Sequence, residues 1–371
     1  MRVLQIANGY LGNRLYENLF SALKERGVES TAYVPLNLNY PPVPPEGEAV
    51  ILSPCFTNLD RLLFFSKQRK LLEDIEGRGL HRDVSMVHAH TLFSGGYAAF
   101  RLHERHGLPY IIAVRNTDVN VFLRWMPHLR KTGLNIMEAA ERIVFLSPAY
   151  RDQVLSRYVP GSRREALRAK SLVIPNGIAP LFFRDPPPPK APPGKVLRLI
   201  YAGELSSNKN LETTVRAAEL LRREGLDVRL TAVGAILDEK YRSLIKKTDF
   251  LEHHDRCPQP ELIRFLQSAD IFVMPSHTET FGLVYAEAMS RGLPVVYTRG
   301  QGFDGHFPDG TAGYAVSDKD PSEVAEAIRK ILPRYGELSE NCLGLVEKFD
   351  WGRIAEQYQT IYQECGKGLE S

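Results

Sequence analysis

The chain has 371 residues, of which 43% are hydrophobic and 25% are charged, a composition typical of folded globular proteins and not of disordered ones. Lysine and arginine number 47 against 44 aspartate and glutamate, and this formal net charge of +3 argues against a general nucleic-acid-binding protein. The four cysteines are scattered and form no C-x-x-C pair, which argues against a disulfide scaffold and a zinc site. No apolar run reaches the ~18 residues that span a bilayer, which argues against a transmembrane protein. We therefore expect a cytoplasmic chain.

The first half of the chain alternates short apolar runs with helical patterns, which is typical of a parallel α/β sheet. Residues 3–7 predict a buried strand, and residues 15–27 predict an amphipathic helix that ends at Gly27. Further strands are expected at residues 31–34, 86–88, 110–114, 143–146 and 172–174. The pattern predicts a doubly wound domain over residues 1–180.

A proline-rich run separates this domain from a second one. Residues 185–194 hold six prolines, which exclude a helix or an inner strand and predict a stiff, extended linker at residues 181–195. The α/β pattern then restarts and predicts a second domain over residues 196–350. Its strands are expected at residues 197–201, 228–233, 271–274 and 295–297, and its helices at 210–223 and 282–291. Ligands are expected at the carboxyl ends of the strands and in a cleft between the domains.

The strongest functional signal is the stretch from Pro275 to Met289. A strand ends at Pro275, a short loop carries Glu279, and a helix begins near Gly282, where unpaired amides would bind a diphosphate. Glu287 lies about five residues along that helix, ~7–8 Å further at its rise per residue. One carboxylate on each side of an anion site suits a nucleotide sugar. The alternative is that both glutamates are ordinary helix charges.

Several segments together resemble a known family. They are the Glu-x7-Glu spacing of Glu279 and Glu287, Lys209 six residues after the glycine of Tyr201-Ala202-Gly203, the segment 173–178, and Phe349-Asp350-Trp351 before a last helix. With these in register, the chain resembles the retaining nucleotide-sugar glycosyltransferases of GT-B fold, family 4 (group 1 glycosyltransferases).

The resemblance implies an α/β protein of GT-B fold, with two Rossmann-like doubly wound domains facing across a cleft. The first domain would bind the acceptor, the second would bind the donor, and a helix at residues 352–365 would pack back on the first. The implied reaction moves a hexose-type sugar from a nucleotide-diphosphate donor to a glycan, a lipid-linked glycan or a small molecule, with retention of anomeric configuration. The resemblance implies no metal ion or other cofactor.

The resemblance also implies roles for single residues in the second domain. Lys209 and Glu279 are the expected catalytic residues, with Lys209 on the leaving diphosphate and Glu279 facing the donor sugar. Glu287 would bind the ribose hydroxyls, and Asn208 would also bind substrate. The backbone amides expected on the diphosphate belong to Phe281, Gly282 and Leu283. The alternative for Lys209 is an exposed loop lysine.

In the first domain, Gly9 and Gly12 flank a turn that the family brings close to the diphosphate and the sugar. The alternative is an ordinary strand–helix turn. Arg115 takes the place where the family carries a histidine near the reacting sugar, and an arginine cannot shuttle protons at neutral pH. Arg115 and its neighbour Asn116 are expected to bind substrate, although Asp118 is an alternative to both.

Two departures from the family pattern leave other functions open. Glu204 stands where the family usually has a phosphate-binding arginine, and Arg115 replaces the histidine. These departures suit a catalytically weak homologue that only binds a nucleotide sugar. A GT-B-type sugar-nucleotide epimerase is the other alternative.

Three further motifs have ordinary structural explanations. His88 and His90 lie on one side of a strand but lack a third metal ligand nearby, so we expect no metal there. Asp320 predicts a helix N-cap in a capping box with Glu323. Residues 61–72 are both basic and apolar, which suits either a helix on the inner face of an anionic membrane or a core helix with a solvated basic face.

Overall fold

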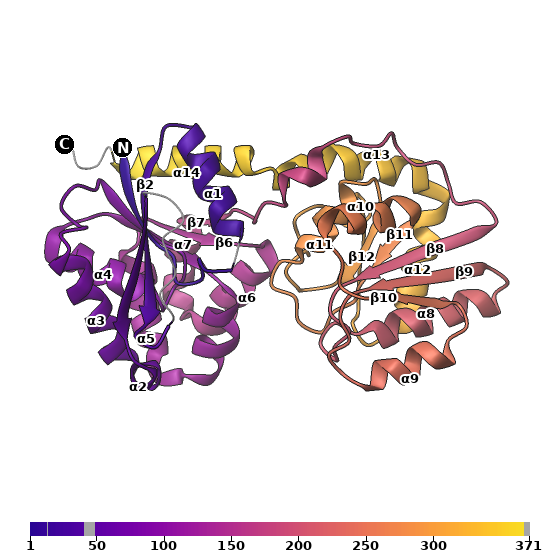
Figure 1. Cartoon of the computed structure of the whole chain (residues 1–371), viewed down its shortest axis with the longest axis horizontal. Helices are drawn as coiled ribbons and strands as arrows, with labels where there is room; N and C mark the ends of the chain where they lie inside the picture. The colour runs from indigo at the N-terminus through magenta and orange to yellow at the C-terminus, as the bar shows by residue number, and fades with distance from the viewer. Residues whose placement is uncertain (13, 41–48, 367–371) are drawn as a thin grey trace. The chain divides into compact units, whose positions relative to one another are not determined.

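The computed structural model describes residues 1–12, 14–40 and 49–366, which form two compact units (Figure 1). The first unit comprises Met1–Leu146, Arg151–Pro175 and the chain from Trp351 onward. The second unit comprises Ser147–Tyr150 and Asn176–Asp350. The chain therefore leaves the first unit at Pro175 and returns to it at Trp351.

The first unit is built on a parallel sheet. Seven strands of its described part pair in the order β3-β2-β1-β4-β5-β6-β7. The strands are β1 (Arg2–Ile6), β2 (Glu29–Asn37), β3 (Val50–Phe56), β4 (Met86–Ala89), β5 (Tyr110–Val114), β6 (Arg142–Phe145) and β7 (Ser171–Val173). The helices are α1 (Arg14–Glu25), α2 (Asn58–Leu62), α3 (Phe64–Gly77), α4 (Gly96–His106), η1 (Asp118–Leu123), η2 (Pro127–Leu129), α5 (Arg130–Ala139), α6 (Pro148–Tyr158), α7 (Gly161–Ala169) and α14 (Trp351–Gly366).

The second unit has the same architecture. Six parallel strands of its described residues pair in the order β10-β9-β8-β11-β12-β13. The strands are β8 (Val196–Ala202), β9 (Asp227–Val233), β10 (Leu251–His254), β11 (Ile271–Val273), β12 (Val295–Thr298) and β13 (Gly313–Val316). The helices are η3 (Pro180–Phe183), α8 (Leu211–Arg223), α9 (Lys240–Lys247), α10 (Gln259–Ser268), α11 (Leu283–Met289), α12 (Pro321–Ile331), η4 (Leu332–Arg334), α13 (Tyr335–Leu345) and η5 (Val346–Phe349).

These two sheets confirm the expected fold class of two Rossmann-like α/β domains. Inner strands such as β5 are buried at every position, because helices cover both faces of a parallel sheet. The sequence patterns did not predict β3, β10 and β13, which are three of the strands at the edges of the described sheets, but they did predict the fourth, β7. An edge strand tolerates polar residues and proline, and β3 accordingly contains Pro54.

The proline-rich run at residues 185–194 contains neither helix nor strand, and it is grouped with the second unit. Lys190 attaches it there: its backbone N–H donates to Ser339 Oγ at 2.8 Å. Its ammonium donates to the carbonyl oxygens of Gln267 and Ala269, at the C-terminal end of α10. These carbonyls lack partners inside the helix, so the lysine satisfies them.

Helix α14 belongs to the first unit, although it follows the whole second unit in sequence (Figure 1, yellow). Trp351, Ile354 and Tyr362 are buried in one hydrophobic cluster with Val3 of β1 and Leu23 of α1. The last helix is therefore part of the core of the first unit, as the resemblance implies for residues 352–365.

A buried polar network ties α14 to the sheet. The hydroxyl of Tyr362 is 2.7 Å from His88 Nδ1 and accepts a hydrogen bond from Gln5 Nε2 at 3.3 Å. His90 Nε2 donates to Gln5 Oε1 at 2.9 Å, and Gln5 Nε2 also donates to Ser30 Oγ. Burial holds the pKa of both histidines well below the ordinary value, so they are neutral members of the core.

We predict that Tyr362→Phe lowers the free energy of unfolding by about 1–3 kcal/mol, because it leaves buried polar atoms of His88 and Gln5 without their partner. Urea unfolding followed by circular dichroism measures the change. Tyr358→Phe is the matched control, since this buried neighbour on α14 has no hydrogen bond to its hydroxyl among the described residues. Equal losses of unfolding free energy in the two variants would contradict a contribution of the hydrogen-bond network to stability.

Candidate active site

The loops that follow four adjacent strands of the second unit meet at one edge of its sheet. They follow β8, β11, β12 and β13, and the carboxyl ends of parallel strands are the usual place for a ligand in such sheets. Hydrogen bonds between these loops hold the predicted catalytic side chains.

Lys209 and Glu279 form an ion pair across two of the loops. Lys209 Nζ lies 2.5 Å from Glu279 Oε2, although the residues are 70 positions apart in sequence. The side chains are only 24% and 12% exposed, so the pair is partly shielded from water. The two residues predicted to be catalytic are therefore in direct contact.

Asn208 joins the same two loops through three hydrogen bonds. Its Nδ2 donates to the carbonyl oxygen of Thr278 at 2.9 Å, and its Oδ1 accepts from the N–H of Thr278 at 3.1 Å. Its carbonyl oxygen accepts from the N–H of His277 at 2.8 Å. Its amide is thus engaged with protein backbone. These bonds hold the loop that carries the neighbouring Lys209, and the expected contact of Asn208 with substrate stays a prediction.

Gln301 and Gly302, in the loop after β12, fix the other side of Glu279. Gln301 Oε1 accepts from the N–H of Glu279 at 3.0 Å, and the N–H of Gly302 donates to its carbonyl oxygen at 2.7 Å. A Cβ atom at Gly302 would lie 2.1 Å from backbone atoms of Thr280, so only glycine fits. These two residues were not predicted. The run Gly300-Gln301-Gly302 immediately after a predicted strand is the signal that marks them.

The start of α11 presents free backbone donors. The N–H groups of Phe281, Gly282 and Leu283 have no hydrogen-bond acceptor within residues 1–12, 14–40 and 49–366. Gly282 has φ +77°, and a Cβ there would lie 2.4 Å from the Tyr285 ring, so the turn requires glycine. Neighbouring unpaired N–H groups at this point suit an anionic ligand, as expected from the sequence.

Glu287 lies in the second turn of α11. Its carboxylate is half-buried and has neither an ion pair nor a hydrogen bond to any described residue. Desolvation by the surrounding protein raises the pKa of this carboxyl group to about 7. An unpaired carboxylate in such a setting favours a ligand that brings hydrogen-bond donors.

Glu204, the residue that departs from the family pattern, is exposed in the loop after β8. It forms no ion pair with any described residue, and its carbonyl oxygen accepts from the hydroxyl of Tyr201 at 2.9 Å. The carboxylate of Glu204 therefore has no ion-pair partner among the described residues.

The first unit places its predicted residues at the carboxyl ends of β1 and β5. Gly12 adopts φ +73°, which requires glycine, whereas Gly9 has no such constraint. Arg115 Nε donates to the carbonyl oxygen of His90 at 3.3 Å. Asn116 Oδ1 accepts from the side chain of Asn120. Gly9, Gly12, Arg115 and Asn116 thus remain candidates for substrate contact.

Asp118, the alternative to Arg115 and Asn116, has a structural role. It is buried, and its carboxylate accepts from the N–H groups of Leu92, Phe93 and Arg115 at 2.9–3.0 Å. Burial raises its pKa to about 6, against the opposing effect of these donors. Its side chain therefore points at the protein backbone and fixes the loop that carries Arg115.

The comparison with known proteins identifies the family. The model of Glycosyltransferase Family 4 matches residues 12–180, and that of Glycosyl transferases group 1 matches residues 185–342. A D-inositol 3-phosphate glycosyltransferase from Arthrobacter sp. (strain FB24) is 30% identical over 308 residues, which cover 76% of this chain and 71% of that protein. The chain belongs to the group 1 glycosyltransferases of family 4.

Solved structures agree with this glycosyltransferase fold. Sucrose-phosphate synthase from Thermosynechococcus elongatus matches with a TM-score of 0.71 and 20% identity, over 98% of each chain. An Anabaena protein solved in complex with UDP and glucose matches with a TM-score of 0.67 and 17% identity, over 98% of this chain and 100% of that one. At these identities the likeness shows the GT-B fold.

The remaining motifs of the glycosyltransferase have structural roles. Asp318 Oδ2 lies 2.7 Å from His277 Nδ1 and so ties the loop after β13 to the Glu279 loop. Asp320 caps α12 by accepting from the N–H groups of Ser322 and Glu323. Glu323 does not complete the expected capping box, because its carboxylate accepts from the N–H of Ser317 instead.

No group of three His, Cys, Asp or Glu side chains in the described part of the chain could hold a metal ion. His88 and His90 instead serve the core network of the first unit. None of the described helices has the length and apolarity to cross a membrane.

Proposed function

We propose that this glycosyltransferase moves a sugar from a nucleotide-diphosphate donor to an acceptor with retention of anomeric configuration. The observation that carries the proposal is the Lys209–Glu279 ion pair beside the free amides of residues 281–283. D-inositol 3-phosphate glycosyltransferases and a glycogen synthase are among the relatives, and the Anabaena neighbour was solved with UDP-glucose. The acceptor would be a glycan, a lipid-linked glycan or a small molecule.

The ion pair suits the charge separation of sugar transfer. When the bond between the anomeric carbon and the phosphate oxygen breaks, positive charge develops on the sugar and negative charge on the leaving diphosphate. Lys209 would stabilise the diphosphate, together with the amides, and Glu279 would stabilise the sugar. Before the donor binds, the attraction between the two charges offsets part of the cost of desolvating them in a shielded site.

Glu287 would bind the ribose of the donor. Its unpaired carboxylate can accept hydrogen bonds from two hydroxyl groups, whereas the backbone amides and Lys209 provide the positive charge for the diphosphate. We propose that this positive charge makes a divalent cation unnecessary. Gly9, Gly12, Arg115 and Asn116 of the first unit would complete the substrate contacts, and Arg115 would stabilise anionic charge.

Removal of either member of the ion pair is expected to slow the reaction. Lys209→Ala and Glu279→Gln should each lower kcat for donor hydrolysis or transfer by roughly 10²–10³, because each removes a contact that strengthens in the transition state. Arg329→Ala is the control, since Arg329 forms a 2.9 Å ion pair with Glu224 at the C-terminal end of α8, the end opposite to the Lys209 loop. A raised KM with unchanged kcat would show that the residue only binds the donor. Full activity in both variants would refute the site.

The role of Glu287 predicts a pH-dependent affinity. Ribose hydroxyls donate to the ionised carboxylate, so protonation below its pKa of about 7 should weaken donor binding. The dissociation constant of UDP-glucose, measured by calorimetry, should rise by up to about tenfold per pH unit below pH 7 and level off above pH 8. The phosphates of UDP-glucose do not titrate in this range. Glu287→Gln should remove the dependence, and an unchanged profile would exclude Glu287.

Product analysis tests retention and metal independence. Nuclear magnetic resonance of the product formed from an α-linked donor should show an α-linked sugar at early times. EDTA should leave the initial rate unchanged, because Lys209 and the amides carry the charge that a metal would otherwise neutralise. A β-linked product would refute retention, and a rate restored only by added Mg²⁺ or Mn²⁺ would refute metal independence.

A further inference from the structure

Large apolar side chains remain exposed in one region of the first unit. Ten such side chains in the described chain are at least 40% exposed, and six of them lie in residues 58–65 and 121–125. These six are Leu59, Leu62, Leu63, Phe65, Val121 and Trp125, with Leu62 at 83% and Trp125 at 69% exposure. Isolated exposed apolar residues are ordinary, but a cluster of them indicates an interaction surface.

The two segments form one surface because Phe64 packs between them. Its ring centroid lies 5.2 Å from that of Phe65, 5.7 Å from that of Tyr97 on α4 and 6.0 Å from that of Phe122 on η1. The structure thereby changes the expectation for residues 61–72. That segment is split at Leu63 into α2 and α3, and the side chains of Leu71 and Leu72 are buried.

The charge around this surface is predominantly positive. Residues 58–72 and 121–131 contain seven lysines and arginines against one acidic residue, Asp60, which pairs with Lys70, in a chain whose overall charge is only +3. Arg124 and Lys131 are exposed and form no ion pair with any described residue. Exposed leucine, phenylalanine and tryptophan beside lysine and arginine are the combination that binds the interface of anionic bilayers.

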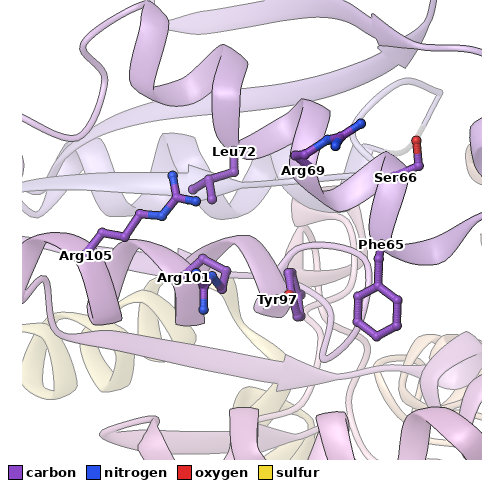
Figure 2. Close-up of a pocket in the computed structure, with 7 residues that line it drawn as sticks. All are labelled: Phe65, Ser66, Arg69, Leu72, Tyr97, Arg101 and Arg105. Atoms are coloured by element: carbon purple, nitrogen blue, oxygen red, sulfur yellow. The ribbon is translucent and has the colours of Figure 1, made fainter.

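A groove of about 480 Å³ lies between α3 and α4 beside this surface (Figure 2). Phe65 and Tyr97 lie near each other at one end of it, and Arg105 extends toward Leu72 at the other. Its arginines Arg69, Arg101 and Arg105 are paired with Glu73, Glu104 and Glu76. The groove therefore adds apolar depth, whereas the net positive charge comes from the surface around it.

We propose that residues 58–65 of α2 and α3, together with residues 121–131, dock the protein on a bilayer of anionic lipids. Leu62, Leu63, Phe65 and Trp125 would enter the boundary between headgroups and acyl chains, and the lysines and arginines would contact lipid phosphates. The break at Leu63 allows this, because it turns consecutive apolar residues outward. The inference rests on exposure and charge and is independent of the proposed sugar transfer.

Vesicle sedimentation tests the proposal. The protein should sediment with phosphatidylcholine vesicles that contain phosphatidylglycerol and should not sediment with pure phosphatidylcholine. Leu62→Ser/Trp125→Ser should weaken this binding at least roughly tenfold. Arg124→Gln/Lys131→Gln should weaken it by roughly fivefold per charge, with a smaller effect at high salt. Emission of Trp125 should shift to the blue on binding, since the other tryptophan, Trp351, is already buried.

Matched controls come from the second unit. Leu237→Ser removes a leucine that is 57% exposed, and Lys246→Gln/Lys247→Gln removes two exposed charges of α9, so neither should change vesicle binding. All variants should keep the donor hydrolysis of the parent without vesicles. Absence of binding, equal binding to both vesicle types, or equal losses in the controls would overturn the proposal. A dimer that Leu62→Ser/Trp125→Ser dissociates would also overturn it, since the surface would then join two copies.

Discussion

The ion pair between Lys209 and Glu279 is the interaction on which the arrangement of the second unit's site depends. Parallel pairing of β8 with β11 brings two loops together that are 70 residues apart in sequence. Asn208 holds one loop against the other, and Gln301 holds the backbone of Glu279 from a third. The positions of Lys209 and Glu279 thus depend on three loops. A change in any of them would alter the position of both charges.

The inner strands could be predicted from the sequence because most of their residues are buried and apolar, as at every position of β5. Of the edge strands in the described sheets, β3, β10 and β13 could not, because an edge strand has one neighbour and tolerates polar residues, whereas the edge strand β7 was predicted from its apolar residues. For the proline-rich run, the sequence predicted the backbone conformation but not the contacts. Its composition determines an extended backbone, but the attachment of Lys190 to α10 depends on carbonyl groups more than 70 residues away.

In the candidate site, spacing from a strand end and along a helix marked Glu279 and Glu287, and the resemblance to the family marked Lys209. The same spacing could not assign Asn208, Gln301 or Asp118. Their side chains bond to backbone atoms of other loops, and the choice between substrate and backbone is decided only when those loops fold together. Polar residues next to a predicted site are for this reason the hardest to assign from sequence.

The return of α14 to the first unit has a consequence for the order in which the protein is made. Ribosomes release the second unit before they release Trp351. The second unit can therefore fold while the core of the first unit still lacks the buried side chains of α14. Until α14 emerges, the faces of β1 and α1 that it covers remain open to solvent and to other nascent chains. The core of the first unit is therefore completed only after the second unit has been synthesised, and until then the first unit is the one in which a chaperone would find exposed apolar surface.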